Sequence, residues 1–238
     1  MPKWKSNTSS NIYNDGTYLE NNPNWHENES PWKARQIEKM MKRNNLCPST
    51  VCEIGCGAGD ILNQLSLERH DVDFCGYEIS EQAFNICRLK ERARLKFQFG
   101  NLLEQDESYF DLVMAIDVIE HVEDYLGFLQ QLKNRGKYKI FHIPLDLSVQ
   151  SVFRSHSITK LRNQVGHLHY FTKDTALETL EYSGYEIIDC FYTRGSVDLP
   201  SGGWKAGLMR IPRMVGFWIH EDIATRVLGG ASLMVLAK

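Results

Sequence analysis

The segment with the sequence VCEIGCGAGD has the composition of a ligand-binding loop. Glycines recur in it as Gly55, Gly57 and Gly59, directly after a short apolar run. Glycine allows the chain to turn sharply and lets bare backbone approach a ligand. The spacing is GxGxG, which differs from the GxGxxG that binds the pyrophosphate of a dinucleotide. The loop therefore predicts a ligand site, and the alternative is a tight turn without a ligand.

An acidic residue ends the next apolar run after this loop. Glu78 lies 19 positions after Gly59, at the end of a second apolar run. In an open α/β sheet, an acid at the end of the second strand can accept hydrogen bonds from both hydroxyls of a ribose. Together, the loop and Glu78 favour an adenosine-containing ligand without a pyrophosphate. The alternative is an exposed acid at a strand end.

Histidines gather in the second half of the chain. His142 ends an apolar run, and His167 and His169 alternate in GHLHYF. Any of the three is a candidate general base for removing a proton from a substrate. The alternatives are structural histidines, or a metal site formed by His167 and His169 with His142 or Asp146. Because nothing in the spacing fixes a metal geometry, we predict no metal site.

Aromatic side chains occur near both ends of the chain. The first group is expected either to close over a ligand as a lid or to pack the first helix, and it consists of Tyr18, Trp25, His26 and Trp32. Residues 195–230 mix methionine, phenylalanine and tryptophan with arginines. We expect this segment to cover a substrate or to form a subunit contact, because its arginines are few for a membrane-surface helix.

The elements that must position these residues follow from apolar patterning. Strands are predicted at 49–55, 71–79, 94–100, 110–117, 137–145, 185–193 and 231–238, and helices at 31–44, 60–69, 80–93, 125–134 and 172–184. Strands that alternate with helices indicate a doubly wound, Rossmann-like parallel α/β sheet with helices on both faces. In such a sheet, ligands bind at the carboxyl ends of the strands.

Composition limits the class of protein. The 238 residues include 27 basic and 30 acidic side chains, and the net charge of −3 argues against bulk electrostatic binding of nucleic acid. No apolar run approaches the roughly 20 residues of a transmembrane helix, and the N-terminus lacks a signal-peptide pattern. Six sparse cysteines without a CxxC pair predict neither disulfides nor zinc, and favour a reducing, cytoplasmic location.

Successive motifs in this chain resemble those of class I S-adenosylmethionine-dependent methyltransferases. The motifs are VCEIGCGAGD, GYEIS, GNLLEQ, FDLVMAIDVIEHV, KIFHIPL and GHLHYFTKDTALETLEYSGYEI, in order over residues 48–194. The chain is most similar to the branch that methylates small molecules, including quinone-biosynthesis-type enzymes. The resemblance implies a seven-stranded sheet whose last strand is antiparallel, S-adenosylmethionine as cofactor and S-adenosylhomocysteine as product. It also implies a small-molecule substrate and leaves a homodimer open.

The resemblance further implies roles for individual residues. Glu53 and the glycines would lie beneath the methionine part of the cofactor, Glu78 would hold the ribose, and Ile79 would pack on the adenine. Asn101 stands where the family often has an aspartate near the adenine amine, and its amide oxygen can accept the same hydrogen bond. Asp117 would line the amino-acid end. The remaining implied residues are Leu102 and Val118 at the cofactor, and His121 beside the substrate lid.

The expected organisation has four parts. These are a lid segment and helix (1–45), a cofactor-binding core (46–194), an insertion over the pocket or at a subunit contact (195–230) and a final core strand (231–238). The predicted function is in-line methyl transfer to an O, N or C nucleophile of a small metabolite. One alternative is a nucleic-acid or protein methyltransferase, although no Asp-Pro-Pro-Tyr-like or Asn-Pro-Pro-Tyr-like tetrapeptide and no Pro-Cys pair occurs. The other alternative is a non-catalytic binding protein of the same fold.

Overall fold

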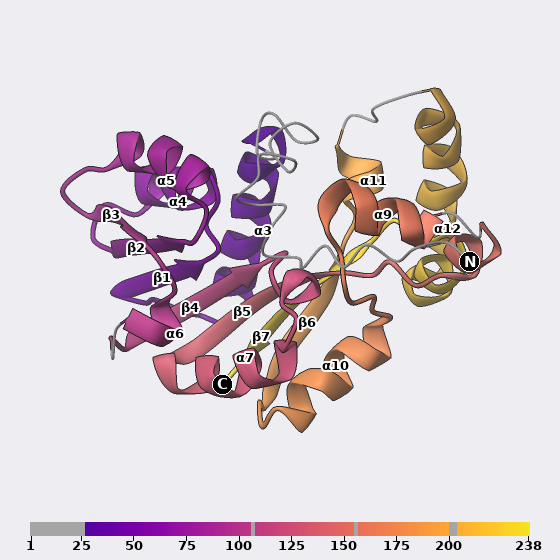
Figure 1. Cartoon of the computed structure of the whole chain (residues 1–238). Coiled ribbons are helices and arrows are strands. Elements are labelled where there is room, and N and C mark those ends of the chain that lie inside the picture. Colours follow the sequence, from indigo (N-terminus) through magenta and orange to yellow (C-terminus); the bar gives the residue numbers. More distant parts are fainter. Residues whose placement is uncertain (1–26, 106–107, 155–156, 200–203) are drawn as a thin grey trace, which may run out of the picture.

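A seven-stranded sheet forms the centre of the molecule. The computed structural model describes residues 27–105, 108–154, 157–199 and 204–238. The strand order is β3-β2-β1-β4-β5-β7-β6; β7 is antiparallel to both of its neighbours, β5 and β6, and the other described pairs are parallel (Figure 1). The strands are β1 (Thr50–Ile54), β2 (Asp73–Glu78), β3 (Leu95–Phe99), β4 (Phe110–Ile116), β5 (Gly136–Pro144), β6 (Ile187–Thr193) and β7 (Ser232–Ala237). The predicted α/β sheet with an antiparallel last strand is confirmed.

Helices cover both faces of this sheet (Figure 1). The α-helices in the described part of the chain are α3 (Ser30–Arg43), α4 (Asp60–Glu68), α5 (Glu81–Cys87), α6 (Leu102–Gln105), α7 (Tyr125–Leu132), α8 (Val149–Phe153), α9 (Ser157–Val165), α10 (Lys173–Tyr182), α11 (Gly195–Asp198) and α12 (Trp204–Leu228). Short 3-10 turns are η1 (Glu27–Glu29), η2 (Arg88–Lys90), η3 (Ile119–His121) and η4 (Lys133–Arg135).

Each face of the sheet has its own apolar core. On one face, α3 and α4 bury Ile37, Met40 and Leu62 completely. On the other face, α7 and α10 contribute Leu129 and Leu180, which are equally buried. Burial on both faces explains the continuous apolar runs of the central strands. The sheet is thereby held rigid, and the loops at the carboxyl ends of β1, β2, β4 and β5 have a fixed frame.

Helix boundaries follow local signals with small shifts. Ser80 and Thr172 cap α5 and α10, because each side chain accepts a hydrogen bond from the backbone three residues later. Ser30 is the first helical residue of α3, one position before the predicted start. The α5 helix ends earlier than predicted, at Cys87, and continues as η2. Here Lys90 bonds the Ala58 carbonyl, and the chain then turns away from helical geometry.

The segments after β5 and β6 form a separate group of helices beside the sheet, namely α8, α9, α11 and α12 (Figure 1). Apolar patterning predicts no helix in these segments. The α12 helix contains Pro212 and is interrupted at His220, whose backbone is extended (φ −162°, ψ 101°). Its outer face exposes apolar side chains, and Trp218 keeps 86% of its surface exposed. No helix in the described part of the chain has the length and apolar character needed to cross a bilayer.

Candidate active site

The glycine loop lies at the carboxyl end of β1 and is held by β2. The Gly55 and Cys56 amides donate to the Tyr77 carbonyl at 2.8 and 3.1 Å. Gly55, Gly57 and Gly59 all have positive φ (+67°, +54° and +78°), which side-chain-bearing residues rarely adopt. A Cβ at Gly57 would meet nothing within 4 Å, so this backbone is open toward the cavity.

Gly59 has a different role from the other two glycines. A Cβ there would lie 2.6 Å from the Phe97 ring and 2.8 Å from Cys87 Cβ. Gly59 is also absent from the residues that line the cavity, whereas Gly55 and Gly57 are among them. It therefore lets α4 begin close against the sheet, and the two glycines before it provide the ligand-facing backbone.

Glu78 is fixed at the end of β2 by backbone donors. Its Oε2 accepts from the Gly57 amide at 2.8 Å, and its Oε1 accepts from the Ser80 amide at 2.7 Å. The residue is only 6% exposed, and burial raises the pKa of this carboxyl against the opposing effect of these hydrogen bonds. The sequence analysis treated Glu78 and the glycine loop as parts of one site, and the structure has them in direct contact. Each carboxylate oxygen retains a further lone pair for a ligand hydroxyl.

The loops after β2 and β3 also line the cavity. Ile79 is 59% exposed and lines the cavity together with Asn101. The Asn101 amide oxygen accepts from the Leu103 amide at 3.0 Å, and its nitrogen donates to Glu104. The expected hydrogen bond to an adenine amine would therefore have to share that oxygen. Leu102 is fully buried in the second core and does not line the cavity.

Asp117, directly after β4, is the centre of a buried ionic network. Its Oδ2 lies 2.8 Å from Lys33 Nζ, and its Oδ1 lies 2.5 Å from His142 Nδ1. Burial by itself would raise the pKa of Asp117, but His142 and Lys33 outweigh burial and hold that pKa well below its usual range. Asp117 also has φ +54°, a strained value for a residue with a side chain. Such strain at a polar cluster is typical of functional sites.

Lys33 reaches this network from α3 and was not singled out in the sequence. Its ammonium also lies 3.2 Å from Glu29, and the two acids outweigh burial to raise the pKa of Lys33 above its ordinary value. Lys33 is four residues before Ile37, so it lies on the same inward face of the helix. A lysine on the buried face was the signal available in the sequence.

Glu53 lies in β1, two residues before Gly55. It is 2% exposed, lines the cavity and leaves its Oε2 without a hydrogen-bond partner. Burial raises the pKa of this carboxyl well above its ordinary value. Val118 also lines the cavity and has its side chain 3.0 Å from the position of a Cβ on Gly55. Glu53, Asp117 and Val118 thus gather at the end of the cavity that Lys33 enters.

The three candidate bases lie in different settings. His142 is 3% exposed and uses both ring nitrogens, because Nε2 contacts Thr193 Oγ1 at 2.8 Å while Nδ1 contacts Asp117. His169 bonds the Val122 carbonyl through Nε2 and does not line the cavity. His167 does line the cavity, and its Nδ1 contacts Asp146 Oδ2 at 2.6 Å. Of the three, His167 is placed to present a ring nitrogen to a substrate.

A second polar group surrounds His167. Glu120 and His121, from η3, line the cavity beside it, and one ligand atom each of Glu120, His121 and His167 lies within 4.8 Å of the others. The Glu120 carboxylate is 0% exposed and has no hydrogen-bond partner on either oxygen, and burial raises its pKa well above the ordinary value. This grouping differs from the His167, His169, His142 and Asp146 set considered from the sequence. Glu120 itself was overlooked, although it directly precedes His121.

Among the four predicted lid residues, Trp32 lies in the described part of the chain. Trp32 lies in the first turn of α3, lines the cavity, donates from Nε1 to Asp198 at 3.3 Å and meets the His142 ring edge-on at 6.3 Å. The other lid residues, Tyr18, Trp25 and His26, lie outside the described residues. Trp32 is 6% exposed and therefore both packs α3 and forms a wall.

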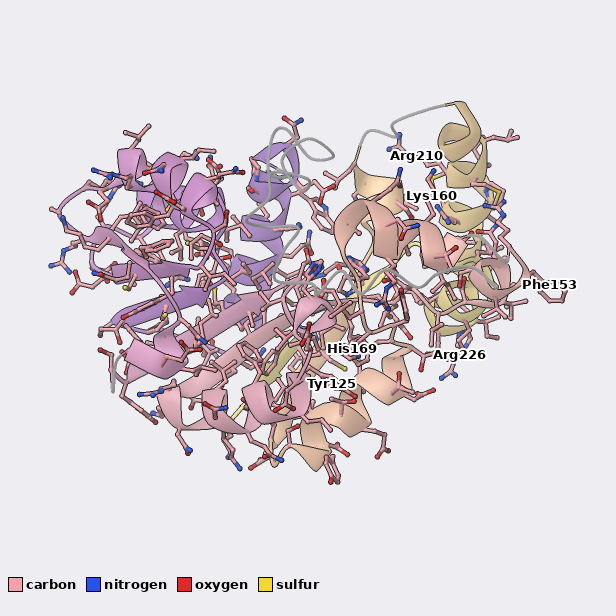
Figure 2. All side chains as sticks on the ribbon, in the orientation of Figure 1. Tyr125, Phe153, Lys160, His169, Arg210 and Arg226 are labelled. Carbon is pink, nitrogen blue, oxygen red and sulfur yellow. The ribbon has the colours of Figure 1, made fainter. Side chains whose placement is uncertain are left out.

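These groups surround one cavity of about 1030 Å³. Its walls include the glycine loop, the Asp117 network and the Glu120 group, together with residues of α8, α9, α11 and α12. From α12 and the following loop come Arg213, Leu228 and Gly230. Within the described part of the segment 195–230, residues in 195–199 and 213–230 therefore contribute to the cavity wall. Figure 2 shows His169 and Tyr125 together at the sheet, and Lys160 and Arg210 on the helices beyond.

Comparison with known proteins gives the family. A family model described as a methyltransferase domain matches residues 24–189. A tRNA (guanine-N(7)-)-methyltransferase of Prochlorococcus marinus is 25% identical over 134 residues, which span 55% of this chain and 64% of that protein. This chain thus matches less than two thirds of that relative's length.

Two solved structures share the fold. The plantazolicin methyltransferase BpumL, in complex with S-adenosylhomocysteine, has a TM-score of 0.64 at 14% identity and covers 97% of this chain and 94% of its own. Magnesium protoporphyrin IX methyltransferase from Synechocystis PCC 6803, also with S-adenosylhomocysteine, has a TM-score of 0.59 at 16% identity and covers 87% and 82%. By family model, the chain belongs to the methyltransferase domain family, and it shares its fold with these two structures.

Proposed function

We propose that this enzyme transfers a methyl group from S-adenosylmethionine to a small molecule enclosed in the cavity. The observation that carries the proposal is that the glycine loop with Glu78 and the Asp146–His167 pair line the same cavity. Its volume of about 1030 Å³ is at the upper end for small-ligand sites, which is enough for a cofactor and an acceptor together. The acceptor atom is an oxygen, nitrogen or carbon nucleophile.

The cofactor fits the residues present. The open backbone at Gly57 and the pinned Glu78 carboxylate suit a ribose, and the exposed Ile79 suits an adenine face. The methionine end of the cofactor carries both an ammonium and a carboxylate. Glu53 has an unbonded buried oxygen for the ammonium, and the Lys33 ammonium suits the carboxylate. Both charges of the amino-acid end therefore have a partner nearby.

The chemistry divides between cofactor and protein. S-adenosylmethionine supplies an activated methyl group on a good leaving group. The protein's residues hold the acceptor in line and exclude water, and such positioning can contribute roughly 7–11 kcal/mol. Trp32 and the α9, α11 and α12 segments form the walls that exclude water. Asp146 orients His167. His167 and Glu120 are the side chains that contact the nucleophilic atom of the acceptor. His142 instead positions Asp117 and the wall beside it, because both of its ring nitrogens are engaged.

Two arginines favour an acceptor with an anionic group. Arg213 and Arg154 both line the cavity, and burial followed by the charge of Arg154 lowers the pKa of Arg213. The Arg213 guanidinium bonds the Leu228 carbonyl and the Gln150 amide oxygen. A carboxylate or phosphate on the acceptor would compensate this pair of like charges.

A nucleic-acid substrate is the second candidate, since the relative from Prochlorococcus marinus is named as a tRNA methyltransferase. The net charge of −3 and the apolar wall of Leu161, Val165 and Leu199 favour a small acceptor instead. The test is release of S-adenosylhomocysteine with a panel of small acceptors, with and without carboxylate or phosphate groups, and with bulk tRNA. Turnover only with tRNA would contradict the proposal.

Two further properties stay predictions. All six cysteines are free in the structure, which supports a reducing, cytoplasmic location. A homodimer would form at the exposed apolar side chains of α8 and α12, among them Phe153 and Trp218. Light scattering on the purified chain measures the mass: a monomer at micromolar concentration would exclude the dimer.

A further inference from the structure

We propose that Glu120, His121 and His167 bind a divalent transition-metal cation, and that this cation binds the acceptor's nucleophilic oxygen. The proposal rests on the proposed function, because it names how the acceptor side of that same cavity works. It adds a metal site that the sequence did not predict, and it narrows the acceptor atom to oxygen.

The three side chains converge at a distance suited to a shared ion. One ligand atom from each lies within 4.8 Å of the other two, and His121 Nε2 is 3.8 Å from Glu120 Oε1. Ligands at about 2.0–2.2 Å from a common metal stand at most about 4.4 Å apart. Small side-chain rotations therefore suffice to close the site. The His121 and His167 rings meet edge-on, with centroids 4.9 Å apart.

The buried carboxylate of Glu120 is the group that a bound cation would stabilise most. It is fully buried, and neither carboxylate oxygen has a hydrogen-bond partner. Removing a carboxylate from water without compensation is costly, and buried carboxylates are normally paired or bound to a metal. Its neighbour His121 and the facing His167 supply ligand atoms on the cavity side. A metal ion at this point would satisfy the carboxylate.

The backbone holds the two ligand-bearing segments together. The Glu120 carbonyl accepts hydrogen bonds from the Leu168 and His169 amides at 2.7 and 3.1 Å. These bonds tie the segment that carries His167 to η3, which carries the other two ligands. The site is thus built before an ion arrives, because its geometry does not depend on the ion alone.

Asp146 completes the arrangement as an orienting residue. It lies 2.6 Å from His167 Nδ1, which leaves Nε2 of that ring for an ion. A carboxylate behind a histidine in this way fixes the ring and strengthens it as a ligand in many metal sites. The pair is also the feature by which His167 differs from the other two candidate bases.

The donor set indicates the kind of ion and its chemistry. Two imidazoles and one carboxylate suit Zn²⁺, Mn²⁺, Fe²⁺ or Co²⁺, whereas Mg²⁺ and Ca²⁺ prefer oxygen ligands alone. Three protein ligands leave coordination positions open. An acceptor hydroxyl bound there loses its proton to solvent more readily. Its oxygen then forms the C–O bond while the C–S bond of the sulfonium breaks, and that electron pair stays on sulfur.

Binding of Co²⁺ tests the site without a known substrate. The full chain, freed of metal with a chelator, is titrated with Co²⁺, and binding is measured from visible absorption and by elemental analysis. We expect one Co²⁺ per chain and a loss of affinity of at least about tenfold in Glu120→Gln and His167→Gln. Asp146→Asn should lose about 10- to 100-fold. The surface variants Glu181→Gln and His70→Gln are matched controls and should bind as the parent does.

Three outcomes would overturn the metal site. The first is the absence of saturable Co²⁺ binding. The second is a Co²⁺ affinity in Glu120→Gln, His167→Gln and Asp146→Asn equal to that of the parent. The third is methyl transfer that persists unchanged after chelation. The last result would leave Asp146–His167 as a metal-free base. Circular dichroism checks folding, and His121→Asn is a second ligand variant should Glu120→Gln fail to fold.

Binding of S-adenosylhomocysteine separates this failure from that of the proposed function. The Glu78→Ala variant should lose S-adenosylhomocysteine and keep Co²⁺, whereas Glu120→Gln should show the reverse. A chain that binds S-adenosylhomocysteine but no Co²⁺ contradicts only the metal site. A chain that binds no S-adenosylhomocysteine contradicts the proposed function, whatever its Co²⁺ binding.

Discussion

The cofactor side and the acceptor side of the cavity are built in different ways. At the cofactor side, the glycine loop and Glu78 are held by backbone amides close to strand ends. At the acceptor side and in the Asp117 network, side chains hold other side chains across long stretches of chain, as Lys33 holds Asp117 and Asp146 holds His167. A group held by backbone amides keeps its place when neighbouring side chains are substituted, whereas a side-chain network loses its contacts when any member is substituted. Substitutions in the two regions should therefore differ in their effects on stability and on ligand affinity.

The largest effect is expected for Asp117→Asn, which removes the charge that Lys33 and His142 share. Asparagine tolerates the positive φ at this position, so the substitution isolates the charge. Breaking a buried ion pair costs about 3–5 kcal/mol. We expect roughly 3 kcal/mol of unfolding free energy here, because 23% of the Asp117 side chain is exposed. Urea denaturation at pH 7 measures the loss.

The same substitution should change how stability depends on pH. The pKa of Asp117 is depressed in the folded chain. Its contribution is therefore fully present above its unfolded value of about 3.9, and is lost as the pH falls below that value toward the folded pKa. The difference in unfolding free energy between the parent and Asp117→Asn should be largest at pH 5–8 and should decrease below pH 4. A constant gap down to pH 3 would show that the charge is not responsible.

Glu78→Ala changes the cofactor side at the carboxylate that accepts from the Gly57 amide. We expect S-adenosylhomocysteine affinity to fall by about 1–3 kcal/mol, or roughly 5- to 150-fold, because the ribose hydroxyls lose an acceptor. Isothermal titration calorimetry measures the change. Glu81→Ala, on the exposed start of α5, is the control and should leave affinity unchanged. Unaltered affinity in Glu78→Ala would refute the ribose assignment.

Arg213→Met tests the acceptor side without touching the cofactor loop. For an acceptor with a carboxylate or phosphate, kcat/KM should fall by roughly tenfold or more, since a charge-assisted hydrogen bond contributes about 1.5–3 kcal/mol. S-adenosylhomocysteine affinity should not change. A parallel loss for neutral acceptors would mean that Arg213 supports the wall of the cavity and does not bind an anion.

The smallest effect is expected for Ser80→Ala, which removes the cap of α5. Loss of an N-cap costs about 1 kcal/mol of stability. The Ser80 amide still donates to Glu78, so S-adenosylhomocysteine binding should persist. Thr172→Ala removes the equivalent cap of α10 and is the matched variant. Thermal unfolding and calorimetry on both variants would show whether a backbone-held cofactor side tolerates the loss of a neighbouring side chain.

The sequence predicted the sheet, and the contact between the glycine loop and Glu78, for a physical reason. Glycines at fixed spacing, an acid at a strand end and continuous apolar strands are local signals, and the structure joins Gly57 to Glu78 as those signals suggest. The Glu120–His167 grouping and the Lys33–Asp117 contact lack a pattern of this kind, because each joins segments far apart in the chain. Glu120 and His167 meet only after β4, β5 and the following segments have packed, and Lys33 comes from the helix before β1. Helix α8 has only five residues, and α9 buries none of its residues.

Strand β7 lies between β5 and β6, although it follows both in the chain. Its pairing with each of them joins the strand that bears His142 to the strand that bears Thr193. Among the described strands, β6 therefore meets the sheet through β7 alone. The hydrogen bond between His142 and Thr193 spans two strands that are not neighbours, so the Asp117–His142–Thr193 chain of contacts depends on β7 keeping β5 and β6 in register.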